Sequence, residues 1–266
     1  MHRFQSFVFC ACVAGVLSCV PGSLHAQDEL DQLGRTCDAG NPTACLDLGH
    51  AYFYGGRGAT RDLTRAAALY RRACEAGHAE GCHQLAVMLD GGMGVSRDAD
   101  LAVTYYEQAC DGGFVVGCHD LALMYESGEG VPLDHARAAE LFQRACDAGE
   151  ATDCYNLGVM YANGIGVAAD PAAAASYYEQ ACDGENATGC QALGMLCFEG
   201  VGVTQDQARA VALFERACDG NEAESCYNLG VIYEAGYGVQ ADSARAAEFY
   251  KKACEAGLED ACRGTR

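Results

Sequence analysis

The apolar positions of this chain follow a helical spacing. From residue 154 the chain reads Cys-Tyr-Asn-Leu-Gly-Val-Met-Tyr, and Cys154, Leu157, Gly158 and Tyr161 share one helical face because they lie three, four and seven residues apart. A Gly-Ile-Gly-Val turn follows, and Asp170 begins a second helical run that ends near Cys182. The pattern predicts two helices joined by a turn whose glycines suit the left-handed end of a helix.

This unit recurs along most of the chain. Its cysteines stand in pairs eight residues apart, and the pairs recur every 36 residues, except for a first interval of 37 with one extra residue near Phe53 and Tyr54. An aspartate stands where it would cap each second helix: Asp62, Asp98, Asp134, Asp170, Asp206 and Asp242. The repetition predicts an all-α fold, a right-handed αα-solenoid of six 36-residue helix-turn-helix repeats.

The repeats divide the chain into segments. Residues 43–258 hold the six repeats, residues 27–42 form an N-terminal capping half-repeat, and residues 259–266 are a C-terminal stub that is too short for a helix of its own and delivers the last cysteine. Residues 1–26 have a basic start, an apolar run, Pro21 and then Ala26 at a cleavable position, which is typical of a secretory signal peptide. Anchoring of a lipoprotein through Cys19 is a minor alternative, because Leu17 is bulky for a lipobox.

The remaining cysteines predict seven local disulfides. Pairing within each helical hairpin would leave Cys37 and Cys262 without partners, whereas pairing across each eight-residue interval uses all fourteen. The short loop also closes more easily, by about 1 kcal/mol of chain entropy. The expected pairs are Cys37 with Cys45, Cys74 with Cys82, Cys110 with Cys118, Cys146 with Cys154, Cys182 with Cys190, Cys218 with Cys226 and Cys254 with Cys262. Cys197 is left without a partner and is expected to be a small buried thiol. The predicted bridges indicate that the protein is secreted or periplasmic, because disulfides persist in oxidising compartments.

The repeat unit resembles a known family. The pattern Leu-Gly-x-x-Tyr-x-x-Gly-x-Gly-Val-x-x-Asp-x-x-x-Ala, from Leu157 to Ala174, resembles the Sel-like repeat (SLR), a relative of the tetratricopeptide repeat. With the Cys-x7-Cys pairs, residues 37–262 resemble the Helicobacter cysteine-rich protein (Hcp) family, also called the Hcp β-lactamase family. The resemblance implies a secreted superhelix with local disulfides and, for some members, penicillin binding or weak hydrolysis of β-lactams.

The charge of the chain and the lack of catalytic motifs disfavour several classes of function. A net charge of −20, with Lys251 and Lys252 as the only lysines, disfavours nucleic acid as a partner. No later segment is apolar enough for a transmembrane span. The sequence contains no Ser-x-x-Lys start of a serine β-lactamase and no zinc motif, so neither a metal nor another cofactor is expected. His83 and His119 occupy one register and could face each other, but they are two ligands short of a metal site, so a surface or ligand-stacking role is favoured.

A polar stripe is the main functional signal. Two residues after the second cysteine of each repeat, the first helices carry Asp47, Gln84, Asp120, Asn156, Ala192 and Asn228. Short amides and carboxylates in a concave groove can hydrogen-bond an extended peptide, and Tyr155 and Tyr227 beside them add contact area. A simply solvated polar face is the alternative. We expect a scaffold that binds proteins or peptides in its groove; the catalytic alternative is a protein that binds or hydrolyses a β-lactam or cell-wall-related small molecule.

Overall fold

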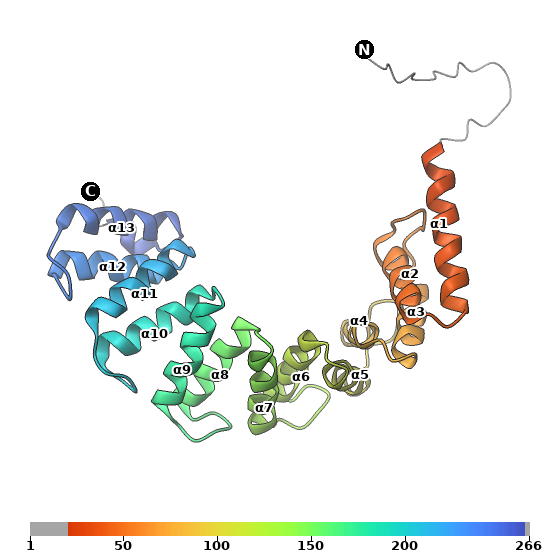
Figure 1. Ribbon diagram of the computed structural model, residues 1–266, viewed down its shortest axis with the longest axis horizontal. Coiled ribbons are helices and arrows are strands. Elements are labelled where there is room, and N and C mark those ends of the chain that lie inside the picture. Colours follow the sequence, from red (N-terminus) through yellow and green to blue (C-terminus); the bar gives the residue numbers. More distant parts are fainter. Residues whose placement is uncertain (1–20, 264–266) are drawn as a thin grey trace, which may run out of the picture.

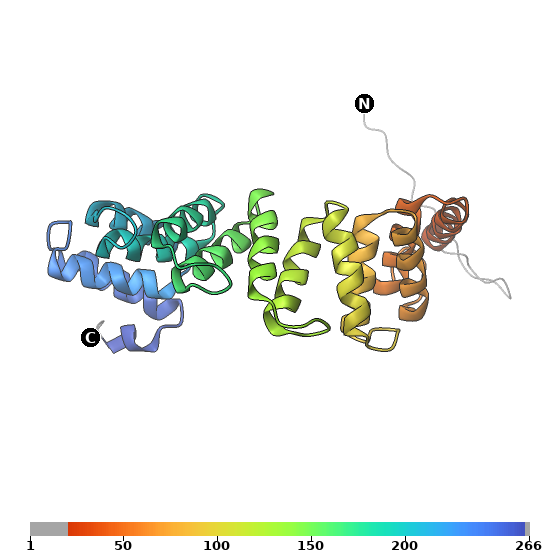
Figure 2. The same ribbon diagram turned by 90° about the horizontal axis from the view of Figure 1, so that it is seen from below.

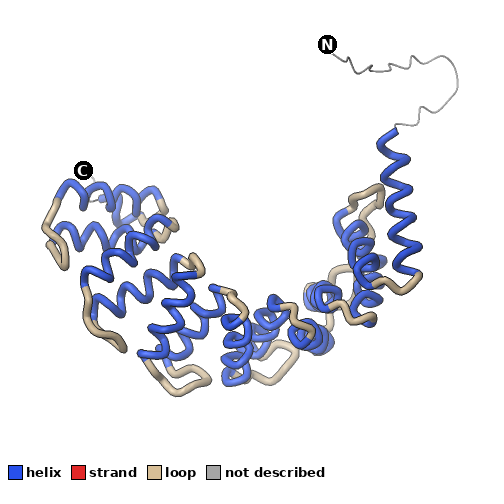
Figure 3. The backbone as a smooth tube through the Cα atoms, in the orientation of Figure 1, coloured by secondary structure: helices blue, strands red, loops and turns tan. Residues whose placement is uncertain are grey.

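The chain folds as a curved stack of helices. The computed structural model describes residues 21–263, and this part contains thirteen α-helices, one short 3-10 helix and no strand (Figures 1 and 3). After α1 (Pro21–Asp38), the first helices of the repeats are α2 (Pro42–Tyr54), α4 (Ala79–Asp90), α6 (Val115–Ser127), α8 (Ala151–Asn163), α10 (Ala187–Glu199) and α12 (Ala223–Ala235). The second helices are α3 (Leu63–Glu75), α5 (Ala99–Asp111), α7 (His135–Asp147), α9 (Pro171–Asp183), α11 (Gln207–Asp219) and α13 (Ser243–Glu255).

The stack forms an arc with two rows of helices. Along its middle, the even-numbered helices lie on the inner side and the odd-numbered helices on the outer side (Figure 1), and the view from below shows the repeats following one another along the long axis (Figure 2). The even helices also contact one another across repeats, α2 with α4, α4 with α6 and α8 with α10. The even helices therefore form the concave surface.

Each second helix begins at its predicted aspartate. The Asp134 carboxylate, for example, accepts a hydrogen bond of 3.0 Å from the backbone N–H of Arg137, and the aspartates before the other five second helices do the same. These bonds satisfy amide groups that have no partner inside the helix. The predicted caps are confirmed at all six positions.

The turn inside each repeat holds two successive repeats together. Gly164 and Gly166 have φ angles of 69° and 70°, in the left-handed region that favours glycine. A Cβ atom on Gly166 would overlap the carbonyl oxygen of His135, at the start of the second helix of the preceding repeat. The turn therefore has a packing role in addition to its conformational one.

The core lies between the two rows. Cys154, Leu157 and Gly158 of α8 are buried and Tyr161 is half-buried, so the face predicted from spacing is the packing face. A Cβ atom added to Gly158 would lie 2.6 Å from the ring of Tyr178 on α9, which shows how closely the two helices approach. Small residues at this register allow aromatic rings of the second helices to fill the space between the rows.

Seven local disulfides join the end of each second helix, or of α1, to the start of the element that follows. All seven form within residues 21–263, with Cα separations between 4.5 and 4.9 Å. The bonded pairs are Cys37 with Cys45, Cys74 with Cys82, Cys110 with Cys118, Cys146 with Cys154, Cys182 with Cys190, Cys218 with Cys226 and Cys254 with Cys262. We call each bridge with its flanking residues a joint. The predicted local connectivity is confirmed, and it places a covalent link at every boundary between repeats.

At the first five joints, a side chain from the next second helix covers the bridge, and the chemistry of that side chain alternates. Arg144 donates hydrogen bonds to the Cys110 carbonyl at 3.2 Å and to the Asp111 carboxylate at 3.1 Å, and Arg72 and Arg216 make the equivalent contacts. At the joints between, Gln108 and Gln180 replace the arginine, and Oε1 of Gln180 lies 3.6 Å from Sγ of Cys146. The first five joints therefore follow a period of two repeats, whereas Lys252 stands at the equivalent position over the sixth joint and contacts the Asp219 carboxylate at 3.4 Å.

Three details differ from, or extend, the sequence predictions. The extra residue of the first repeat lies after α2, between Gly55 and Gly58, where Arg57 takes a positive φ of 54°; the helix keeps its register and the turn absorbs the insertion. A 3-10 helix, Glu259–Arg263, forms in the stub where no helix was expected, because five residues suffice for a 3-10 turn. The signal-peptide prediction and Cys19 fall mostly outside the described residues; residues 21–26 belong to α1.

Candidate functional site

The concave surface carries the predicted polar stripe. Asp47, Gln84, Asp120, Asn156 and Asn228 all lie on even-numbered helices and all are half-buried. Asp47, Asp120 and Asn228 each line a separate hollow, whereas Gln84 and Asn156 lie on the same surface between them. Side chains of this kind offer hydrogen-bonding groups along the groove without projecting far from it.

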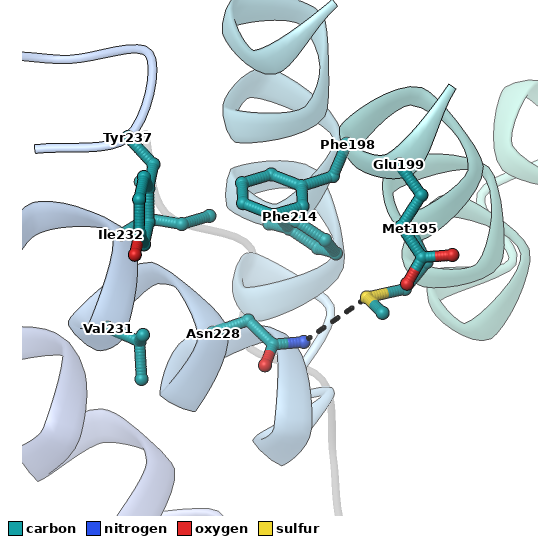
Figure 4. Close-up of a pocket in the computed structure, with 8 residues that line it drawn as sticks. All are labelled: Met195, Phe198, Glu199, Phe214, Asn228, Val231, Ile232 and Tyr237. Atoms are coloured by element: carbon teal, nitrogen blue, oxygen red, sulfur yellow. Dashed lines mark hydrogen bonds between the residues drawn. The ribbon is translucent and has the colours of Figure 1, made fainter. Parts of the chain in front are cut away.

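An apolar cavity opens between α10 and α12. Its volume is about 220 Å³, and it is lined by Met195, Phe198, Phe214, Asn228, Val231 and Tyr237 among others. Figure 4 shows Phe214 at the back, Asn228 pointing toward Met195 and Tyr237 on the opposite side. Asn228 Nδ2 lies 3.9 Å from Met195 Sδ, and Glu199 also lines the hollow, so one amide and one carboxylate stand among mostly apolar side chains.

An acidic cavity occupies the equivalent place between α4 and α6. Its volume is about 460 Å³, and its lining includes Asp90, Tyr106, Asp120, Leu123, Glu126 and Glu129. All of these except Glu126 have a counterpart in the apolar cavity: Asp90 corresponds to Phe198, Tyr106 to Phe214, Asp120 to Asn228, Leu123 to Val231 and Glu129 to Tyr237. The same repeat geometry therefore provides one apolar and one acidic hollow.

The two predicted histidines do not act as a pair. His83 Nε2 lies 2.7 Å from Asp120 Oδ2 on α6, and His119 Nδ1 lies 2.6 Å from Asp153 Oδ1 on α8. Each histidine therefore joins its own repeat to a carboxylate of the next repeat. The hydrogen bond to Asp153, which is only 2% exposed, raises the pKa of His119, and the charges of Asp153, Asp120 and Glu150 act in the same direction against burial.

The two tyrosines beside the stripe pack within their own repeats. The ring of Tyr155 lies 5.8 Å from that of Tyr178, and the ring of Tyr227 lies 5.5 Å from that of Tyr250, measured between centroids. Tyr155 is half-buried, whereas Tyr227 is 37% exposed. Burial among its neighbours raises the pKa of Tyr178 to about 12. Tyr227 therefore offers more surface to a ligand than Tyr155 does.

Cys197 is enclosed on α10. It is fully buried, and burial raises the pKa of its thiol, which disfavours the reactive thiolate. Across residues 21–263, no group of three or more His, Cys, Asp or Glu side chains is placed to hold a metal ion. The helices of this same part of the chain are too short or too polar to cross a membrane.

Sequence reasoning missed the apolar residues that lie beside the stripe. Leu123, Met195 and Val231 stand three residues after stripe positions, and Ile165, Val201 and Tyr237 stand in the turns. The signal was available, because residues three apart share a helical face. Five of these six residues are exposed and Val231 is half-buried, which the pattern did not show because apolar residues at helical spacing are usually core.

Comparison with known proteins identifies the repeats. A family model described as the Sel1 repeat matches six segments, residues 42–78, 79–114, 115–150, 152–186, 187–222 and 223–258. These segments cover most of the chain. None of the curated proteins searched matches the chain significantly.

Solved structures of repeat proteins also resemble the chain. A Sel1 repeat protein from Oxalobacter formigenes is 28% identical, with a TM-score of 0.76 over 91% of this chain and 72% of that one. A protective antigen of uropathogenic Escherichia coli that displays an SLR fold is 28% identical, with a TM-score of 0.53 over 87% of this chain and 57% of that one. The cysteine rich protein B of Helicobacter pylori is 29% identical, with a TM-score of 0.41 over 49% of this chain and 94% of that one.

Proposed function

Because the chain belongs to the Sel1 repeat family, we propose that it is a scaffold that binds a protein or an extended peptide segment in its concave groove. Sel1 repeats have a scaffold fold that is consistent with protein–protein interaction. The observation that carries the proposal is the row of half-buried amides and carboxylates at one register of the concave surface, with exposed apolar side chains beside it. Such a surface can bond a peptide backbone and hold its side chains in hollows.

The seven disulfides support an extracytoplasmic location, because such bridges persist in oxidising compartments. We propose secretion or a periplasmic location after removal of residues 1–26. Mass spectrometry of the protein purified from periplasm and from culture medium tests this. We expect a mature chain that begins at Gln27; a chain that keeps residues 1–26, or one lipidated at Cys19, would contradict the proposal.

A pull-down from periplasmic extract tests the groove. The wild-type protein should recover one or more partners, and the double variant Asn156→Ala, Asn228→Ala should recover much less of them. Gln240→Ala, an exposed change in the loop before α13, is the matched control and should recover the wild-type set. Recovery of the same partners in equal amounts by the double variant would argue against binding in the groove.

Sel1 repeat proteins are generally non-catalytic scaffolds, which agrees with a binding function. The β-lactam alternative is tested separately with the chromogenic substrate nitrocefin. We expect no turnover above that of a buffer control. Turnover that persists through purification and in EDTA would contradict a purely binding role and would identify a metal-independent hydrolase.

A further inference from the structure

Exposed apolar side chains recur at fixed positions from the third repeat to the sixth. Five of the nine exposed large hydrophobic residues among residues 26–262 occupy just two registers of the repeat: Leu123, Ile165, Met195, Val201 and Tyr237. Met195 is 38% exposed and Tyr237 is 47% exposed, and both line the cavity between α10 and α12. Exposed apolar side chains that recur at fixed registers, with two of them at one cavity, favour a site of interaction.

The cavity between α10 and α12 has the size and chemistry of a side-chain pocket. Apolar cavities of about 150 Å³ in proteins can hold benzene, so the 220 Å³ here has room for a Leu, Met or Phe side chain. Phe214 closes it from behind and is 1% exposed, so the pocket has a fixed floor. The Oδ1 atom of Asn228, at the edge, is positioned to accept a hydrogen bond from a peptide backbone.

The equivalent cavity between α4 and α6 selects for charge. Arg97 contacts both Asp90 and Glu129, and His83 bonds Asp120. Glu126 lines the same cavity and is only half-buried, so the carboxylates outnumber the arginine. This excess fits a chain with a net charge of −20 and favours a cationic group on the ligand.

The two cavities are three repeats apart. With helices packed at about 10 Å per repeat along the inner row, the separation is roughly 30 Å, which an extended peptide spans with about nine residues. We propose that the groove takes an extended peptide segment that places one bulky apolar side chain between α10 and α12 and a Lys or Arg side chain, about nine residues away, between α4 and α6. This inference rests on the proposed function, because it specifies the ligand of the same groove.

Selection from a phage-displayed library of random 15-residue peptides tests the proposal on the full mature protein with its disulfides intact. We expect enriched peptides to combine a Leu, Met or Phe with a Lys or Arg about nine positions away. A synthetic copy of the most enriched peptide is then titrated by fluorescence anisotropy. We expect Met195→Glu to weaken binding at least tenfold and Glu126→Gln to weaken it about threefold, with the effect of Glu126→Gln shrinking at high salt.

Matched controls separate this inference from the proposed function. Leu133→Glu adds the same charge at an exposed apolar position outside both cavities and should leave binding unchanged. Circular dichroism and the mass of the oxidised protein verify that each variant keeps its fold and its bridges. Enriched peptides that bind in the groove but are acidic, or that are unaffected by Met195→Glu, would overturn this inference and leave the proposed function intact. An absence of any enrichment over the Asn156→Ala, Asn228→Ala variant would overturn both.

Discussion

Gly166 allows two successive repeats to approach closely because it has no Cβ atom. It has a positive φ of 70°, and an added Cβ atom would overlap the backbone carbonyl of His135 in the preceding repeat. We expect Gly166→Ala to lower the free energy of unfolding by about 1–3 kcal/mol, because neither the dihedral angle nor the backbone of α7 can adjust cheaply. Urea unfolding followed by circular dichroism measures the change.

Gly34 provides the matched control for this substitution. It lies inside α1, and no atom lies within 4 Å of the position that a Cβ atom would occupy. Gly34→Ala should therefore stabilise the protein by about 0.5–1 kcal/mol, because alanine favours helix. Equal effects of the two substitutions would show that the close approach at Gly166 contributes nothing.

His119 gives the joint between the third and fourth repeats a pH dependence. Its hydrogen bond to Asp153 raises its pKa in the folded protein above the usual 6.5. A raised pKa means that the charged pair contributes its full stability below about pH 6.5, and that this contribution is lost as the pH rises through the folded-state value. The wild type should exceed His119→Gln in stability by more at pH 6 than at pH 9, as measured by urea midpoints.

The comparison with His119→Gln isolates this residue from the many carboxylates that also titrate. An NMR titration of the His119 ring gives a second reading, and its midpoint should lie above 6.5. A stability difference that is the same at both pH values, together with an unshifted midpoint, would contradict the prediction.

Among the elements, the second helices depend on their caps. Asp134 accepts a hydrogen bond from the Arg137 amide at the start of α7. Asp134→Ala should lower stability by about 1 kcal/mol, because the amide group loses its partner. Asp147→Ala, at the exposed opposite end of the same helix, removes the same charge and should change stability by less than about 0.5 kcal/mol, because an acid there opposes the helix dipole. Similar losses for both in thermal melts would contradict a capping role.

The elements were largely predictable because their signals are local. Asp170, the glycines of the Gly-x-Gly turns and the spacing of Cys154, Leu157 and Tyr161 each act within one or two helical turns, and all appear in the structure as expected. The exact place of the extra residue was not predictable, because a helix and a turn can each absorb one residue. Only the geometry around Arg57 decides between them.

The side-chain contacts along the groove were less predictable. The repeat pattern of the sequence places Asp120 and Asn228 at one register. It does not predict that His83 bonds Asp120 or that Met195 contacts Asn228. Asp153 was unexpected as a partner, because it stands at a buried register that holds Gly81, Gly117 and Gly189 in other repeats. Contacts between repeats depend on the rotation from one unit to the next, which one repeat's sequence does not contain.

At the scale of the whole molecule, the main helix contacts within residues 21–263 are made inside one repeat or between adjacent repeats, so the effect of a substitution should depend on where it lies along the stack. We expect the double variant Cys146→Ala, Cys154→Ala, at a central joint, to lose about 2.6 kcal/mol by loop entropy. Hydrogen exchange should rise in α7 and α8 and in the helices next to them.

Removal of the terminal bridge is the natural comparison. Cys254→Ala, Cys262→Ala should raise exchange in α13, the following 3-10 helix and the neighbouring α12, because these are the described elements that the terminal bridge joins or that pack against them. If both double variants raised exchange along the entire chain equally, the molecule would unfold as one cooperative unit and the nearest-neighbour description would be wrong.

The alternation of arginine and glutamine over the joints bears on the history of the gene. The segment Tyr-Tyr-Glu-Gln-Ala-Cys-Asp occurs at residues 105–111 and again at 177–183, whereas the intervening Leu-Phe-Gln-Arg-Ala-Cys-Asp at 141–147 returns at 213–219 as Leu-Phe-Glu-Arg-Ala-Cys-Asp. In these segments, each repeat is therefore more similar in sequence to the repeat two places along than to the adjacent repeat. A copying event that carried two repeats together, about 72 residues of coding sequence, accounts for this order more simply than the addition of single repeats does.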